Sequence, residues 1–231
     1  APSFEGWATL CNFAPNNWER IPSVSRYANL SWSDGKAWQH RVLTKIEPND
    51  LQRFNATELS VFMPEGVSGY LSLTERPLPA QTSELPPTGE NKTVYPFWRA
   101  TLGLTSKAGA ETAYQGEIDP FPSPASLLTF GHFLQYHQGV QNLLLFVNLE
   151  ASPEGREGEI EIRKADAPSE LLRSARVSNN AITCISLDGV GLTDDDLPLI
   201  VCRQLAGIPL YLSSTEDGLF LSLEHTHPPA S

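Results

Sequence analysis

The sequence predicts a mainly β protein: an antiparallel β-sandwich or a jelly-roll-like barrel, with one buried C-terminal helix and minor N-terminal helical turns. Two observations favour this class. About ten short apolar or alternating segments run along the chain, and 19 prolines and 16 glycines among 231 residues separate them. The alternative is an α+β fold in which a helix packs against one sheet.

The chain is expected to form a single β-rich domain over residues 1–231, of which 1–57 is an irregular aromatic segment. Single sandwiches and barrels run to roughly 200–250 residues, so the length does not require a second domain. Within 1–57, the triplet Ser33-Asp34-Gly35 predicts the start of a short helix toward Ile46, with Ser33 as its cap. Residues 50–54 predict another helical turn.

Strand patterns begin near Glu58. The proline-rich stretch 77–92 is predicted to be a surface loop, because proline cannot donate a hydrogen bond to a sheet. The run 142–149 is apolar on both faces, which predicts a central strand that is covered on both sides. Further strands are predicted over 59–63, 70–74, 93–105, 112–118, 126–134, 159–163 and 181–187.

The clearest predicted helix begins at the aspartates 194–196 and ends at Gly207. The aspartates supply capping oxygens and negative charge where the helix dipole favours it, and Pro198 fits the first turn. Glycine commonly follows the end of a helix. The apolar residues with helical spacing are Leu197, Ile200, Val201 and Leu205.

Charge and cysteine content narrow the function classes. The formal net charge is −11, so the surface repels phosphate backbones and anionic lipids, and we expect neither a nucleic-acid partner nor a membrane partner. The cysteines at 11, 184 and 202 have neither zinc-site spacing nor a disulfide framework. We expect a soluble protein, cytoplasmic rather than secreted. The start Ala-Pro-Ser leaves open whether a signal peptide was removed.

The last predicted hairpin carries the pattern that points to a metal. Two strands, 208–213 and 219–226, flank an Asp-Gly turn that ends at Gly218. His225 and His227 are two residues apart, so on a strand both imidazoles point to the same side, as metal ligands must. The further candidate ligands are His132, His137, Glu117 and Glu150.

This histidine pair on a β-rich background is similar in part to the metal site of the cupins. The spacing from Gly218 to the pair is one residue too long. The acidic residue and the glycine that should follow are replaced by Pro228-Pro229-Ala230-Ser231. We therefore do not assign the chain to that family. A metal-dependent, cupin-like enzyme is the alternative function, and two rim histidines without a metal are the competing interpretation.

The N-terminal tryptophans are the candidate ligand-binding residues. Trp32 and Trp38 lie among polar residues, which favours exposure, and indole rings stack on sugar faces. The leading prediction is a non-catalytic binding or interaction module that recognises a glycan or a protein through aromatic and loop surfaces. The competing interpretation places these rings in a small core or a subunit interface. A structural subunit of an oligomeric assembly is the third function considered.

Two acidic patterns have simpler explanations than catalysis or calcium binding. Glu117 and Asp119 share one side of a strand, whereas catalytic carboxylates usually face each other across a cleft. Residues 194–196 are adjacent aspartates, whereas a calcium loop alternates its ligands with spacers. The chain contains no GxSxG, Walker, GxGxxG or HExxH motif, so the sequence identifies no reaction and no cofactor.

Overall fold

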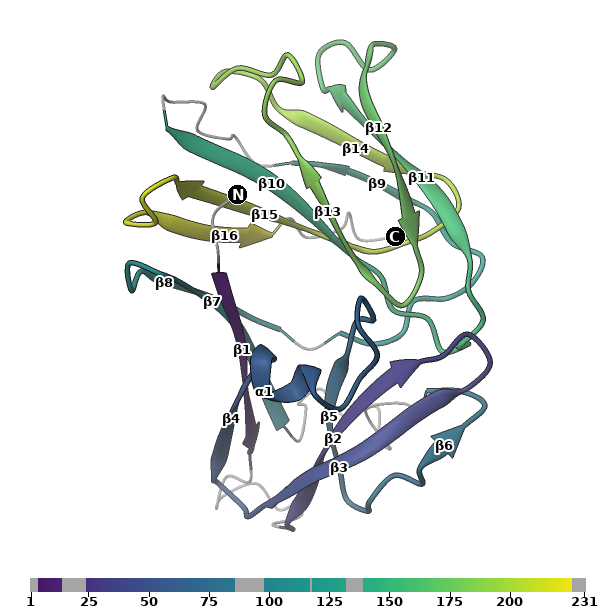
Figure 1. The fold of residues 1–231 in the computed structure, drawn as a ribbon. Coiled ribbons are helices and arrows are strands. Elements are labelled where there is room, and N and C mark those ends of the chain that lie inside the picture. Colours follow the sequence, from purple (N-terminus) through teal and green to yellow (C-terminus); the bar gives the residue numbers. More distant parts are fainter. Residues whose placement is uncertain (1–3, 14–23, 86–97, 117, 132–138, 226–231) are drawn as a thin grey trace.

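The computed structural model describes residues 4–13, 24–85, 98–116, 118–131 and 139–225 (Figure 1). These residues form sixteen strands and one short helix, α1 (Ala56–Ser60). All pairings within the four four-stranded sheets are antiparallel, and no sheet among the described residues closes into a barrel. The predicted mainly β, antiparallel class is therefore confirmed. No helix of this part of the chain is long and apolar enough to cross a membrane.

The strands before residue 118 form two sheets, named here after their long strands β1 and β2. The β1 sheet has the order β4-β1-β7-β8 and the β2 sheet the order β5-β2-β3-β6. They pack together around Leu10, Ala28 and Phe54. The strands are β1 (Phe4–Asn12), β2 (Arg26–Ser33), β3 (Trp38–Ile46), β4 (Leu51–Asn55), β5 (Tyr70–Thr74), β6 (Gln81–Thr82), β7 (Trp98–Ser106) and β8 (Glu111–Gln115).

The strands after residue 118 form the β10 sheet and the β11 sheet. The β10 sheet has the order β13-β10-β15-β16 and the β11 sheet the order β12-β11-β14-β9. Their shared core is centred on Leu144, Phe146, Ile160 and Ile200. The strands are β9 (Leu127–Phe130), β10 (Val140–Val147), β11 (Glu157–Lys164), β12 (Leu171–Ser178), β13 (Ile182–Ser186), β14 (Pro198–Cys202), β15 (Ile208–Thr215) and β16 (Leu221–His225).

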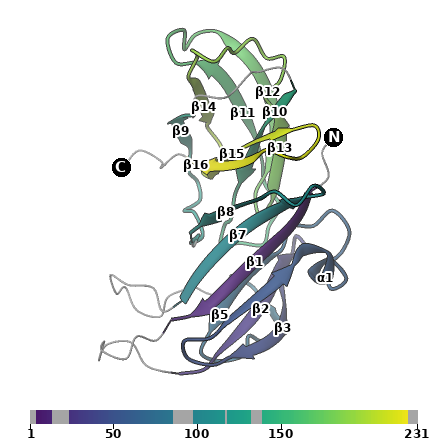
Figure 2. The same cartoon turned by 90° about the vertical axis from the view of Figure 1, so that its left-hand side faces the viewer.

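The β10 sheet is covered on both faces. Leu144 and Phe146 of β10 face the β11 sheet, whereas Leu143 and Leu145 point the other way, toward the β1 sheet. The prediction of a doubly covered strand over 142–149 is confirmed. Figure 2 shows β8 below β16, where these two edge strands come together.

One face of the β1 sheet serves two neighbouring sheets. Leu10 and Ala100 pack against the β2 sheet, and Phe4 and Leu104 pack against the β10 sheet. Side chains point alternately to the two faces of a strand, and even-numbered residues of β1 pair with even-numbered residues of β7. All four residues therefore lie on the same side of the sheet. The middle of this face therefore lies where three sheets meet.

The predicted C-terminal helix is wrong. Residues 198–202 form β14, which is buried along its whole length between β11 and β9. An unbroken apolar run with β-branched residues suits a strand that is covered on both faces, and proline is tolerated at its first position. Asp196 does not cap a helix. It accepts hydrogen bonds from the backbone N–H and the hydroxyl of Thr193, and it pairs with Lys164 at 3.1 Å.

The expectation of an irregular segment over 1–57 with helical turns is also wrong, because this segment holds β1 to β4. The predicted helix start is a turn in which Asp34 accepts hydrogen bonds from the backbone N–H groups of Lys36 and Ala37, and β3 follows. Residues 50–54 lie mostly in β4. The helix α1 lies immediately after it, where a strand over 59–63 was predicted.

Only part of the predicted proline-rich loop is described. Within 77–85, β6 pairs with Trp38 and Gln39 of β3, so this stretch forms an edge strand as well as a loop. Leu85 is buried, and its backbone N–H donates to the carbonyl oxygen of Ala151 at 2.8 Å. The remainder, 86–92, lies outside the described residues.

Candidate functional site

An apolar cavity lies where the β1, β2 and β10 sheets meet; we call it the three-sheet cavity. It consists of two adjoining lobes of about 350 and 170 Å³. Small-molecule sites commonly enclose roughly 300–1,000 Å³, so the larger lobe alone reaches that size. The residues that line both lobes are Ala8, Gly69, Leu71, Leu102, Val147, Ile182 and Leu210.

Small residues leave this space open. Ala8 of β1 lies directly opposite Leu102 of β7, so a methyl group stands where a larger side chain would fill the centre of the face. A Cβ atom at Gly69 would lie 2.6 Å from Sδ of Met63 and 2.9 Å from Cδ1 of Leu30. Glycine at this position therefore leaves room for those two side chains in the lining of the larger lobe.

Trp7 is among the residues at the larger lobe, but its indole ring lies on the face of the β1 sheet opposite to Ala8 and Leu102. It lies opposite Gly103, and a Cβ atom at that glycine would lie 2.2 Å from the indole ring. The indole N–H donates to the Thr105 hydroxyl at 3.1 Å, and the Arg53 guanidinium lies 4.0 Å from the ring centroid. Hydrogen bonds from Thr105 and Arg53 also lower the pKa of Glu111, which keeps this supporting carboxylate charged.

Two large aliphatic residues of the lining are open to solvent. Leu102 is 41% exposed and Ile182 is 48% exposed. Apolar surface gains roughly 25 cal/mol for each Å² that is removed from water, so an occupant that covers these side chains is favoured. The backbone N–H of Ile182 donates to the Ser68 hydroxyl at 3.1 Å, which ties the start of β13 to the segment before β5.

The chemistry of the lining is apolar with a few hydroxyl groups. Among the described lining residues none carries a charged side chain. Thr101, Tyr70 and Tyr114 line the smaller lobe, and the Tyr70 hydroxyl donates to the carbonyl oxygen of Ile118 at 3.2 Å. The cavity thus offers apolar contact area together with hydroxyl groups at one end.

Two of the predicted metal ligands can be placed. His225 ends β16 and packs edge-on against Tyr114, with 4.6 Å between ring centroids. Glu150 belongs to a separate polar network. Within the described part of the chain, no three potential ligands gather around one point, and the metal site stays a prediction. The residues His132, His137, His227 and Glu117 lie outside the described residues.

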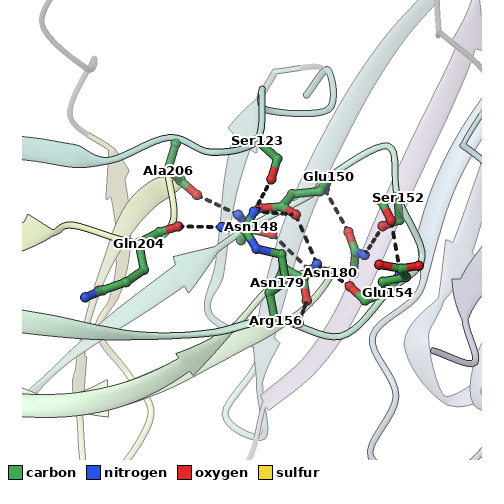
Figure 3. Close-up of polar contacts among 10 residues, drawn as sticks. All are labelled: Ser123, Asn148, Glu150, Ser152, Glu154, Arg156, Asn179, Asn180, Gln204 and Ala206. Carbon is green, nitrogen blue, oxygen red and sulfur yellow. Dashed lines mark hydrogen bonds and ion pairs between the residues drawn. The ribbon is translucent and has the colours of Figure 1, made fainter.

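Glu150 is the centre of a buried polar network (Figure 3). Its two carboxylate oxygens accept hydrogen bonds from Nη1 of Arg156 at 2.9 and 3.1 Å, and Asn179 donates to Oε2 at 3.1 Å. The backbone N–H of Glu150 donates to the Asn180 side chain at 2.7 Å. The carboxylate is 2% exposed and fully paired, so this network holds the segment 148–156 against the turn at 179–180.

The predicted exposure of Trp38 is wrong. Trp38 is 2% exposed, and its indole N–H donates to the carbonyl oxygen of Ala151 at 2.7 Å. It forms a small core with Leu85 and Leu149. A buried ring cannot stack on a sugar, so these two tryptophans do not form a joint glycan platform. Trp32 is half-buried, and its role in binding stays a prediction.

No protein-family model, curated protein or solved structure matches this chain. The three-sheet cavity is therefore the feature of the molecule that suggests a function, and it was not predicted from the sequence. Its lining comes from strands far apart in the chain. The one signal in the sequence was the occurrence of small residues at inward positions of strands, as at Ala8 and Ala100.

Proposed function

We propose that this protein is a non-catalytic binding protein that takes an apolar small-molecule ligand into the three-sheet cavity. The observation that supports this is a cavity of ligand size whose apolar lining includes the exposed Leu102 and Ile182. The binding role is the one predicted from the sequence, but the contact surface is the junction of three sheets instead of the N-terminal aromatics.

The lining of the three-sheet cavity includes apolar surface that is in contact with water. Full burial of a leucine or isoleucine side chain contributes roughly 1.5–3 kcal/mol of favourable free energy. Leu102 and Ile182 are only about half buried, so a ligand that covers them gains part of this free energy. Junctions between packed layers are also common positions for ligand sites, because side chains there are less completely interlocked.

Titration with the uncharged fluorescent probe N-phenyl-1-naphthylamine tests the proposal. We expect saturable binding, and we expect Leu102→Asp to weaken it at least tenfold. Leu51→Asp is the matched control, because Leu51 lies on β4 of the same sheet, is 59% exposed and does not line the cavity. Absence of saturable binding, or equal losses in both variants, would contradict the proposal. Unfolding curves for both variants verify that they fold.

A further inference from the structure

We infer that the ligand of the three-sheet cavity is an uncharged amphiphile with one aliphatic chain and a hydroxyl-type head group. This inference rests on the proposed function and adds the chemical class and the orientation of the ligand. The head group lies in the smaller lobe and the chain runs into the larger one. The shape of the cavity, its charge and the position of its hydroxyl groups carry the inference.

The shape favours a chain over a rigid ring system. The two lobes share seven lining residues, among them Ala8, Leu102 and Val147, so together they form one space with two compartments. A flexible chain can follow such a path with low-energy torsions. A rigid polycyclic ligand has no such torsions with which to adjust to both lobes.

The charge distribution disfavours an anionic head group. A carboxylate that leaves water needs a cation or several donors, and none of the described lining residues carries a positive charge. The whole chain has a formal net charge of −11, which also repels anions during approach. A neutral head group meets neither penalty.

The hydroxyl groups orient the ligand. Tyr70 and Tyr114 line only the smaller lobe, and a hydroxyl head group can both donate to and accept from phenol hydroxyl groups. Among the described residues that line the larger lobe, none has a hydroxyl side chain. An aliphatic chain therefore fits the larger lobe.

Displacement of the bound naphthylamine probe by straight-chain alcohols and by carboxylates of equal chain length tests the ligand class at pH 8. We expect alcohol affinity to rise about fourfold per methylene until the cavity is full, and matched carboxylates to bind at least tenfold more weakly. Equal or tighter carboxylate binding, or no dependence on chain length, would overturn the inference. In either of these outcomes the probe itself would still bind. If the proposed binding function is wrong, the probe does not bind saturably at all.

The path of the chain is tested by filling the shared lining. We expect Ala8→Phe to move the affinity plateau to shorter alcohols. Ala113→Phe is the control, because Ala113 is exposed on β8 and does not line the cavity. Leu102→Trp, at a partly exposed position, provides a second test if Ala8→Phe does not fold. An unchanged plateau in a folded variant at either lining position would show that the chain does not pass between the lobes.

Discussion

His40 is a buried imidazole whose protonation state is fixed by neighbouring hydroxyl groups. Its Nδ1 lies 2.7 Å from the Ser31 hydroxyl and its Nε2 lies 2.8 Å from the Thr82 hydroxyl. Thr82 donates its proton to the carbonyl oxygen of Glu84, so Nε2 donates to Thr82 and Nδ1 accepts from Ser31. A serine–histidine pair is a feature of nucleophilic catalysis, but Ser31 is fully buried here, so the pair serves the fold.

The first prediction concerns acid stability. Burial lowers the pKa of His40, so below about pH 6.5 the unfolded chain binds a proton that the folded protein does not. The free energy of unfolding is therefore expected to fall as the pH drops from 6.5 toward the lowered folded value. Urea unfolding between pH 8 and 5 measures this slope. His40→Gln should reduce it, and an identical slope in the variant would refute the assignment.

The second prediction concerns the Glu150–Arg156 pair. Removal of one partner leaves a buried charge without compensation, so Arg156→Leu is expected to lower the free energy of unfolding by about 3–5 kcal/mol. Arg203→Leu is the matched control, because Arg203 is 64% exposed in its pair with Glu161 and should cost below about 1 kcal/mol. Urea unfolding of both variants checks this prediction, and similar costs would contradict it.

At the scale of the element, the segment 148–156 is held from two sides. The Glu150 network fixes one side. On the other, Trp38 and Leu85 both donate to the carbonyl oxygen of Ala151, and the Ser33 hydroxyl donates to that of Pro153 at 2.6 Å. Strands from the first part of the chain therefore hold a loop that belongs to the second.

The third prediction follows from this arrangement. Trp38→Ala removes a large buried ring and should lower the free energy of unfolding by about 3–5 kcal/mol. Trp38→Phe keeps an aromatic ring and loses one hydrogen bond, which costs roughly 1 kcal/mol plus the cost of the smaller volume. Trp32→Ala, at a half-buried position, is the comparison. A cost for Trp38→Ala no larger than that of Trp32→Ala would contradict a core role for Trp38.

The elements also show what the sequence could and could not predict. Apolar runs and turn residues were enough to predict the class and the doubly covered strand β10. The prediction was wrong at residues 198–202, where an acidic cap pattern and the apolar spacing are typical of a helix. These residues form a strand instead, because β14 pairs with β11 on one side and with β9 on the other. The cavity was beyond prediction, because Ala8, Leu102 and Ile182 become neighbours only through strand register and sheet packing.

At the scale of the whole molecule, the two groups of sheets share an extended apolar contact. Leu210, Leu212 and Leu223 pack against Phe4 and Leu104 of the β1 sheet. Two hydrogen bonds border this contact: the Ser106 hydroxyl donates to the carbonyl oxygen of Gly218 at 2.6 Å, and the Thr112 hydroxyl accepts from the backbone N–H of Leu223 at 3.1 Å. Each group of sheets leaves apolar surface exposed if the other unfolds.

The fourth prediction is that the chain unfolds in one cooperative transition, as expected for the predicted single domain. Native-state hydrogen exchange should give the same opening free energy for the central amides of β2 and of β11. Leu104→Ala, at the contact, should lower both values by about 2–4 kcal/mol. If β2 and β11 have different opening free energies and Leu104→Ala lowers only one of them, the two groups of sheets unfold independently.

The pairing of β1 with β7 has a consequence for how the chain is made. Phe4 lies opposite Ser106 and Asn12 lies opposite Trp98, so β1 cannot complete this pairing before residue 106 has been synthesised. Until residue 106 is synthesised, the apolar face of β1 has neither its long partner nor the β10 sheet to cover it. Pairings between such distant segments close slowly. The pairing of β1 with β7 is therefore expected to be among the slow steps of folding.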